Sequence, residues 1–206
     1  MSAPGRTHER PGGTGHGAAD APSPWVLRHL PLVATGGAVL DLAAGHGRHA
    51  RLIAGAGHAV LALDRDAGAL AALRLQAGVT ALEADLEGGP WPLPGRFFAG
   101  IVVTNYLWRP LLGHLTAALA PAGILIYETF RVGNEALGKP SNPDFLLREG
   151  ELLELARAAG LAVVAFESGQ VTHPRPAVIE RICARRAAPG APPAALPASS
   201  AGGYTR

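Results

Sequence analysis

The chain has 206 residues, enough for one folded domain with a sizeable hydrophobic core. The formal net charge is only +2, and the basic side chains, all arginine except Lys139, are dispersed along the sequence. No basic block of the kind that binds nucleic acid is present in the sequence. The single cysteine, Cys183, excludes an internal disulfide, and no Cys/His grouping has the spacing of a zinc site. We therefore expect a cytoplasmic protein without a metal site.

The two ends of the chain differ in composition from its middle. Residues 1–24 are rich in Gly, Pro, Ala and His, and residues 187–206 are rich in Ala, Pro and Ser. Neither segment has enough large apolar side chains to offset the entropy lost on ordering. We predict a disordered leader over 1–24, a folded domain over 25–186 and a disordered tail over 187–206. No apolar run approaches the roughly 20 residues that span a membrane, and the N-terminus lacks the apolar core of a signal peptide.

Short apolar runs alternate with helix-like segments in the domain, as in parallel strands joined by right-handed crossovers. The predicted strands cover residues 38–42, 59–63, 79–84, 97–104, 124–129, 161–167 and 177–185. The predicted helices cover residues 46–56, 66–76, 110–120 and 148–159. Only a short loop separates the last two strands, so they must pair antiparallel. The predicted fold class is α/β, with a Rossmann-like, seven-stranded, mostly parallel sheet and an antiparallel C-terminal strand pair.

The turn after the first predicted strand is the most informative motif. Residues 39–49 read Val-Leu-Asp-Leu-Ala-Ala-Gly-His-Gly-Arg-His. Gly45 and Gly47 permit a sharp turn against which a ligand can lie, and the following helix offers unpaired N–H groups. Asp41 places a negative charge four residues before the first glycine. That charge would repel a pyrophosphate and attract an ammonium or sulphonium group.

These features resemble the class I S-adenosylmethionine-dependent methyltransferases over about residues 25–186. The first motif of that family, acid-x-x-x-Gly-x-Gly, corresponds to Asp41, Gly45 and Gly47. The resemblance implies that Asp64, ending the second strand, binds both ribose hydroxyls and that Asp85, after the third strand, approaches the adenine amino group. It thus implies S-adenosyl-L-methionine as the cofactor. Three acids at the carboxyl ends of consecutive strands also match the place where open α/β sheets bind ligands.

The acceptor side is expected around the ends of the fourth and fifth strands. Asn105 and Tyr106 stand where relatives that methylate nitrogen often carry Asn/Asp-Pro-Pro-aromatic, but the prolines are missing. We expect Asn105 to bind the cofactor or the acceptor, and we take Tyr106 and Glu128 as tentative catalytic residues. Glu128 is the best available general base and is equally well explained as an anchor. The segment 130–147 is longer than most connections in a compact domain, and loops of this length usually have a function. This stretch resembles bacterial methyltransferases broadly similar to tellurite-resistance methyltransferases.

Two alternatives stay open from the sequence. Gly-x-Gly-x-x-Ala, ending at Ala50, also fits the loose dinucleotide fingerprint, so an NAD(P)-binding oxidoreductase is a serious rival. Asp41, the antiparallel strand pair and the lack of a Tyr-x-x-x-Lys pair favour the methyltransferase. The second alternative is a non-catalytic cofactor-binding sensor or scaffold. The acceptor atom is not fixed by the sequence, and the lack of a basic stripe favours a small-molecule acceptor over RNA.

Overall fold

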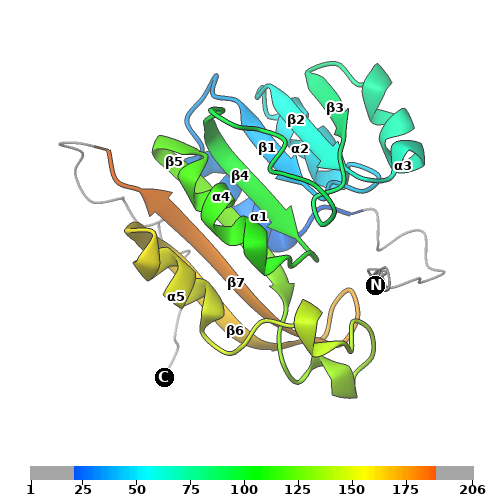
Figure 1. Ribbon diagram of the computed structural model, residues 1–206, viewed down its shortest axis with the longest axis vertical. Coiled ribbons are helices and arrows are strands. Elements are labelled where there is room, and N and C mark those ends of the chain that lie inside the picture. Colours follow the sequence, from blue (N-terminus) through cyan, green and yellow to red (C-terminus); the bar gives the residue numbers. More distant parts are fainter. Residues whose placement is uncertain (1–20, 189–206) are drawn as a thin grey trace, which may run out of the picture.

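A single seven-stranded sheet forms the centre of the protein, whose computed structural model describes residues 21–188 (Figure 1). In spatial order, the strands are β3 (Val79–Glu83), β2 (Val60–Asp64), β1 (Val39–Leu42), β4 (Phe98–Thr104), β5 (Leu119–Phe130), β7 (Ala177–Arg186) and β6 (Leu161–Val171). Neighbouring strands from β3 to β5 pair parallel, and β7 lies antiparallel between β5 and β6. The predicted α/β sheet with an antiparallel C-terminal pair is confirmed.

The strand order changes direction beside β1. The chain proceeds from β1 outward to β3 and then returns to place β4 on the other side of β1. Asp41 consequently pairs in register with Ala62 of β2 and with Val102 of β4. The connections after β1 and β4 leave the sheet in opposite directions, which is the switch point where open α/β sheets bind ligands.

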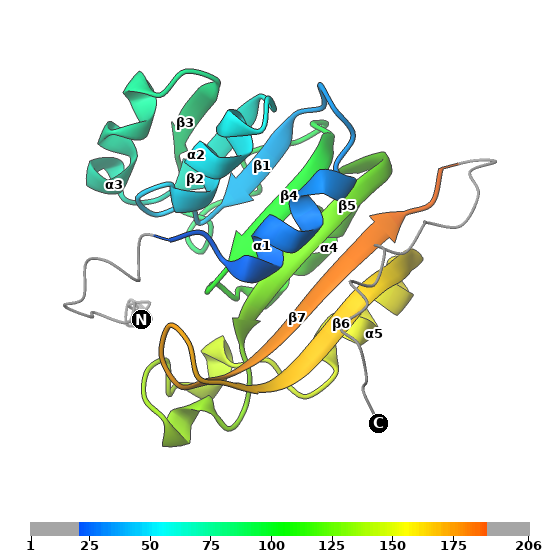
Figure 2. The same cartoon turned by 180° about the vertical axis from the view of Figure 1, so that it is seen from behind.

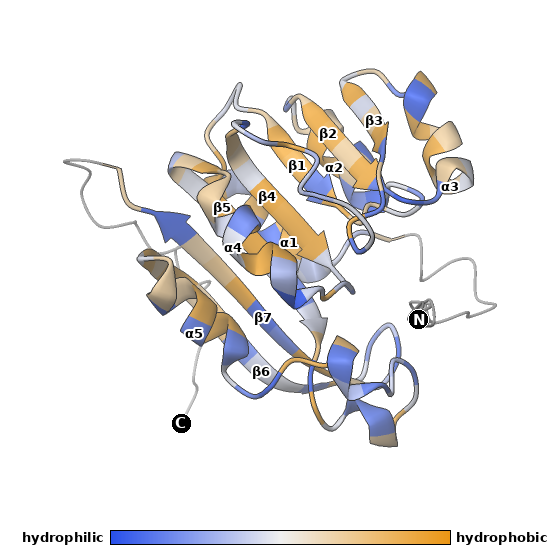
Figure 3. Ribbon diagram, viewed as in Figure 1, coloured by the Kyte–Doolittle hydropathy of each residue, from blue (hydrophilic) through white to orange (hydrophobic). Residues whose placement is uncertain are grey.

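Helices cover both faces of this sheet. They are α1 (Pro24–His29), α2 (Arg48–Gly55), α3 (Ala67–Ala71), α4 (Leu112–Ala117) and α5 (Glu151–Ala158). α1 and α2 cover the face seen in Figure 2, and α4 and α5 cover the face seen in Figure 1. In β1, Val39 packs with the α1 and α2 side, whereas Leu40 and Leu42 pack with the α4 and α5 side. Figure 3 shows hydrophobic residues concentrated on β1, β2 and β4, as expected for strands buried on both faces.

Helix α1 is not among the predicted elements. It begins at Pro24, and the Oγ of Ser23 accepts a hydrogen bond from the Trp25 N–H at 3.1 Å. A serine cap followed by proline in the first turn is a recognised helix start, so the sequence does carry a signal for it. Residues 21–24 of the predicted leader are therefore part of the described structure. Residues 1–20 and 189–206 lie outside the described residues.

Two predicted helices are shorter than expected and interrupted. Residues 66–76 form α3 and a separate 3-10 turn, η2 (Leu73–Leu75). Residues 110–120 begin in η3 (Arg109–Leu111), and α4 ends at Ala117. β5 starts before residue 124 because Leu119 already pairs with Phe98, ahead of a register shift in the ladder. The residues between the predicted helix 110–120 and the predicted strand 124–129 therefore lie inside a long, irregular strand.

The long connection after β5 is ordered by hydrogen bonds. It contains two 3-10 turns, η4 (Asn134–Ala136) and η5 (Pro143–Phe145). The buried Asn134 donates from Nδ2 to the Pro140 carbonyl at 3.1 Å and accepts from the Val178 N–H at 3.1 Å. These bonds fix the middle of the connection against the start of β7.

Candidate active site

The turn between β1 and α2 adopts the tight geometry that its glycines predict. Gly45 and Gly47 have positive φ angles of 56° and 76°. A Cβ on Gly47 would lie 2.3 Å from Cδ2 of Leu73, so a side chain there would be both strained and obstructed. The turn therefore keeps its backbone close to the carboxyl end of β1.

Asp64 joins this turn to the end of β2. Its Oδ2 accepts a hydrogen bond from the Gly45 N–H at 2.7 Å, and its Oδ1 accepts one from the Asp66 N–H at 3.0 Å. Two of the predicted cofactor residues, Gly45 and Asp64, are thus in direct contact.

Asp41 is buried near the carboxyl end of β1, with only 1% of its surface exposed. Within the described residues its Oδ2 has no hydrogen-bond partner. Burial raises the pKa of Asp41 to about 7, although a hydrogen bond from the Ala50 backbone and the nearby Arg48 act in the opposite direction. The neighbouring Asp64 adds to the increase of the pKa. An approaching cation would favour the ionised form of this carboxyl.

Asp85 completes a row of acids along the same edge of the sheet. It follows β3, whose Glu83 pairs in register with Asp64. The Asp85 side chain is exposed and accepts a hydrogen bond from the Glu87 N–H at 2.9 Å, which orders the turn after β3. The carboxyl ends of β1, β2 and β3 therefore each carry an acid, as the sequence predicts.

The expected acceptor residues lie at the end of β4. Asn105 has a φ of 54°, and its backbone N–H donates to the Glu128 carbonyl at 2.9 Å. The backbone of Asn105 is therefore fixed, and its side chain is exposed. Tyr106 is largely buried, and the Tyr127 hydroxyl donates to the Tyr106 carbonyl at 2.9 Å. Burial raises the pKa of the Tyr106 hydroxyl above its ordinary value, so this group stays protonated near neutral pH.

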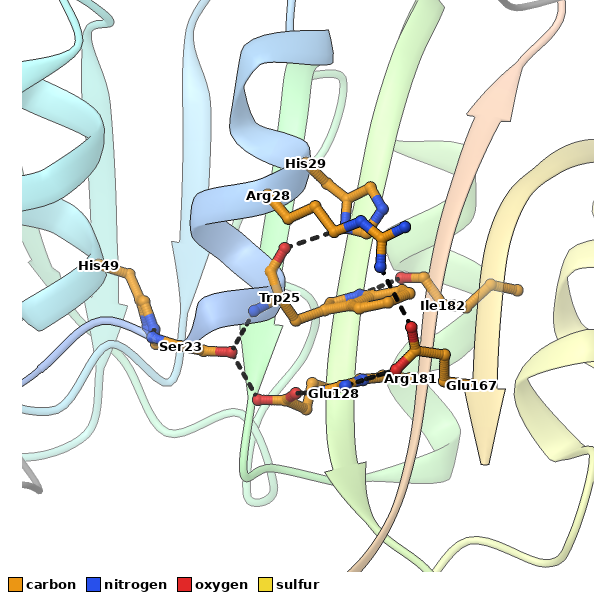
Figure 4. A network of polar contacts seen from close by, with 9 residues as sticks. All are labelled: Ser23, Trp25, Arg28, His29, His49, Glu128, Glu167, Arg181 and Ile182. Atoms are coloured by element: carbon orange, nitrogen blue, oxygen red, sulfur yellow. Dashed lines mark hydrogen bonds and ion pairs between the residues drawn. The ribbon is translucent and has the colours of Figure 1, made fainter. Parts of the chain in front are cut away.

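Glu128 is held by two partners at the end of β5. Its Oε1 accepts a hydrogen bond from the Ser23 hydroxyl at 2.8 Å, and its Oε2 forms an ion pair with Arg181 of β7 at 3.0 Å (Figure 4). These contacts favour the anchoring role over the role of a general base. The base role stays a prediction.

The network around Glu128 extends across α1, β6 and β7. Arg181 also pairs with Glu167, which in turn pairs with Arg28 at 3.2 Å. In Figure 4 the Trp25 ring lies between Arg28 and Arg181, whose guanidinium carbons are 5.9 Å and 4.8 Å from the ring centroid. The indole N–H donates to the Ile182 carbonyl at 3.2 Å. These contacts hold α1 against β6 and β7.

His49 is a buried residue for which the sequence predicted no role. Its Nε2 lies 3.0 Å from the Ser23 backbone nitrogen, and its Nδ1 lies 3.3 Å from Oγ1 of Thr104. A backbone N–H can only donate, so Nε2 is the acceptor and the neutral ring carries its proton on Nδ1. Burial, assisted by Arg48, lowers the pKa of His49 to about 3. His49 and Ile53 share a helix face, which is the only sequence signal for its burial.

No cluster of His, Cys, Asp and Glu in residues 21–188 has the arrangement of a metal site. No helix in that range is long and apolar enough to cross a membrane.

Comparison with known proteins gives structural matches only, since no family model and no curated protein matches the sequence. TehB from Haemophilus influenzae is 16% identical, with a TM-score of 0.64 over 78% of this chain and 61% of TehB. An S-adenosylmethionine-dependent methyltransferase from Mesorhizobium loti is 20% identical, with a TM-score of 0.61 over 79% of this chain and 98% of that protein.

A third structure contains ligands. It is the 1,6-didemethyltoxoflavin-N1-methyltransferase of Burkholderia thailandensis, with bound 1,6-didemethyltoxoflavin and S-adenosylhomocysteine. It is 22% identical, with a TM-score of 0.57 over 79% of this chain and 76% of that enzyme. The expected resemblance to class I methyltransferases is thereby confirmed at the level of the fold. This chain has the fold of the S-adenosylmethionine-dependent methyltransferases.

Proposed function

We propose that this protein is an S-adenosylmethionine-dependent methyltransferase that acts on a small molecule. The observation that carries the proposal is the glycine turn at the switch point beside β1, flanked by acids at the ends of three adjacent strands. A methyltransferase fold makes this edge the natural place for the cofactor. The acidic character of the edge favours a cofactor with cationic groups over a pyrophosphate.

The residues of the turn fit S-adenosylmethionine chemically. Asp41 has a buried oxygen that lacks a partner within the described residues, which suits an ammonium group. A Cβ on Gly47 would overlap the buried Leu73, so glycine at this position preserves the tight turn. We assign Asp41, Gly45 and Gly47 to the methionine portion of the cofactor, and Asn105 to its border with the acceptor.

The other two acids suit the remaining parts of the cofactor. Asp64 ends β2 beside the glycine turn, and its carboxylate is a suitable acceptor for the ribose hydroxyls. Asp85 is exposed at the neighbouring strand end, where its carboxylate could accept from the adenine amino group. The same edge thus offers acceptors spaced along β1, β2 and β3.

The bound cofactor supplies a methyl group on a positively charged sulphur. This sulphur leaves as a neutral thioether, so the methyl group is readily transferred by in-line displacement. The protein then has mainly to orient the two reactants, and orientation alone can account for roughly 7–11 kcal/mol of a reaction barrier. Tyr106, whose hydroxyl stays protonated, can donate a hydrogen bond but is a poor base. Glu128 is proposed to shape the acceptor side through Ser23 and Arg181.

Calorimetry with the purified protein tests the cofactor assignment. We expect S-adenosylmethionine and S-adenosylhomocysteine to bind, and NADH to give no heat of binding. The variant Asp64→Ala should weaken binding of both adenosyl ligands by tenfold or more while remaining folded by circular dichroism. Binding of NADH alone would favour the oxidoreductase and overturn the proposal.

Turnover with labelled donor tests the reaction and the acceptor class. The protein is incubated with methyl-labelled S-adenosylmethionine and a bacterial lysate, which is then separated into small-molecule, protein and RNA fractions. We expect label in the small-molecule fraction. Cofactor binding without any transfer would instead identify a sensor or scaffold.

A further inference from the structure

The segment before α1 lies along the carboxyl edge of the sheet. In Figure 2 it runs from the start of α1 toward α2, across the side where β1 and β4 end. Its contacts come from both sides of the switch point. The Ser23 N–H donates to His49 on α2, the Ser23 hydroxyl donates to Glu128 on β5, and Nη1 of Arg48 donates to the Ala21 carbonyl at 3.2 Å. Residues 21–23 are called the strap below.

Besides the bond from Arg48 to Ala21, the strap is joined to the fold at Ser23. Its N–H donates to His49, and its hydroxyl donates to Glu128 while accepting from the Trp25 N–H. Ser23 is buried, so the loss of either external bond would leave a buried polar group unsatisfied. Local opening at this residue therefore requires both His49 and Glu128 to be released.

The helix that follows the strap has further contacts of its own, besides its cap at Ser23. Trp25 is buried, its indole donates to Ile182, and both faces of its ring are near guanidinium groups of α1 and β7. These contacts do not involve His49 or Arg48. The strap can therefore swing away at Ser23 while α1 stays docked, which is how a low-stability segment opens beside a rigid one.

The contact with His49 requires a neutral ring. Nε2 must keep its lone pair to accept from Ser23, and Nδ1–H then points to Oγ1 of Thr104. The charged groups around this contact are Arg48 on α2, which acts on His49, Glu128 on β5, which accepts from Ser23, and Asp41 on β1, which accepts from the Ala50 backbone. Thr104 and Ser23 present only neutral groups to the ring.

We propose that the strap is a gate over the methyl-transfer site, held shut by the contacts of Ser23 with His49 and Glu128, and that it must open for the cofactor to enter and for its demethylated product to leave. This inference rests on the proposed function, because the gated site is the cofactor site. His49 is then a positioning residue: it holds the gate and does not take part in methyl transfer. The same contacts join the cofactor side, at α2, to the acceptor side, at β5.

Two measurements on the full chain test the gate. The first is the hydrogen-exchange rate of the Ser23 amide, followed by NMR in the ligand-free protein. The second is the dissociation rate of S-adenosylhomocysteine, followed by stopped flow. For His49→Leu we expect about tenfold faster exchange, the effect of losing one hydrogen bond, and faster dissociation by a similar factor. His49→Gln, which restores an acceptor, should recover most of both rates.

Arg28→Gln is the matched control. It removes an ion pair and a ring contact of α1 but leaves the Ser23 contacts in place, so both rates should match the wild type. Unchanged dissociation in His49→Leu despite faster exchange would overturn the gate. Equal rates in His49→Leu and Arg28→Gln would overturn it as well. Failure of the wild type to bind S-adenosylhomocysteine would overturn the proposed function, and with it the gate, whatever the exchange rates.

Discussion

The backbone N–H of Gly45 donates a 2.7 Å hydrogen bond to Oδ2 of Asp64. This bond joins the turn after β1 to the end of β2, so the two halves of the proposed cofactor site share one carboxylate. Any group that binds Asp64 also acts on the glycine turn. Stability and cofactor affinity should therefore be coupled at this position.

The variant Asp64→Asn tests that coupling. One amide atom of asparagine cannot accept a hydrogen bond, so either Gly45 or Asp66 loses the acceptor of its N–H. We expect the free energy of unfolding to fall by about 1–3 kcal/mol and the affinity for S-adenosylmethionine to fall at least about tenfold. Urea unfolding and calorimetry measure the two effects.

Asp66→Asn is the control for this substitution. Asp66 caps α3 by accepting from the Ala69 N–H at 3.0 Å, and asparagine is an equally good helix cap. Stability and cofactor affinity should both stay close to wild type. Equal losses in the Asp64 and Asp66 variants would contradict a special role for Asp64.

Gly47 should tolerate alanine worse than other glycines with positive φ. Both Gly47 and Gly57 would place alanine in a left-handed conformation, with φ angles of 76° and 88°. Only Gly47 would also bring its Cβ within 2.3 Å of Leu73, whereas nothing lies within 4 Å of a Cβ on Gly57. Gly57→Ala should cost about 1–2 kcal/mol of unfolding free energy, and Gly47→Ala distinctly more.

A double-mutant cycle with Leu73→Ala separates the two costs at Gly47. Because the shorter side chain removes the obstruction, the double variant should be more stable than the sum of the single effects predicts. Urea unfolding of the four proteins gives the coupling energy. A coupling near zero would mean that backbone strain alone excludes alanine at this position.

The fold was predictable where the relevant signals are local. The Gly-x-Gly turn, the acids near the carboxyl ends of β1, β2 and β3, and the apolar runs of the central strands all reflect a residue's immediate neighbours in the chain. The antiparallel pairing of β6 and β7 also followed from a short loop. These features are sufficient to predict the edge of the sheet at which the candidate cofactor residues meet.

The contacts of Ser23 could not be predicted in the same way. Its partners His49 and Glu128 are 26 and 105 positions away in the sequence. No periodicity or spacing encodes such pairs, because they form only when separate strands and helices meet. The same reasoning applies to Arg181, which joins Glu128 to Glu167. Because the segment 1–24 has few apolar residues, the sequence predicts a disordered leader there, although Ser23 is fixed by contacts with the fold.

Arg109 should determine the order of the long connection after β5. It donates to both carboxylate oxygens of Glu151, at 2.7 and 2.9 Å, and to the carbonyls of Asp144 and Leu146, at 2.9 and 2.8 Å. For Arg109→Gln we expect about tenfold faster proteolytic cleavage within residues 130–147, because four bonds are weakened together. Cofactor affinity should change little, since these contacts lie away from β1 and β2.

Arg157→Gln provides the matched control, because Arg157 is exposed on α5. Its cleavage rate should equal that of the wild type. Limited proteolysis with mass spectrometry locates the cut sites. Unchanged cleavage in Arg109→Gln would show that other contacts, such as those of Asn134, are sufficient to order the connection.

Two buried groups give opposite pH dependences of stability. Burial raises the pKa of Asp41 from 3.8 to about 7, so the folded protein binds this proton more tightly than the unfolded chain. The resulting stability is lost as the pH rises from 3.8 to about 7 and changes little above that. Burial lowers the pKa of His49 from 6.5 to about 3, so the unfolded chain binds that proton more tightly. Stability is then lost as the pH falls below 6.5.

Asp41→Asn should remove only the first of these dependences. The amide is uncharged at every pH, so relative to this variant the wild type should lose on the order of 3 kcal/mol of unfolding free energy between pH 5 and pH 8. Urea unfolding of both ligand-free proteins across this range measures the difference, in which the contribution of His49 cancels. We expect the stability of the variant minus that of the wild type to increase with pH and to level off above the pKa of Asp41. A difference that stays constant with pH would contradict a protonated Asp41 in the folded protein.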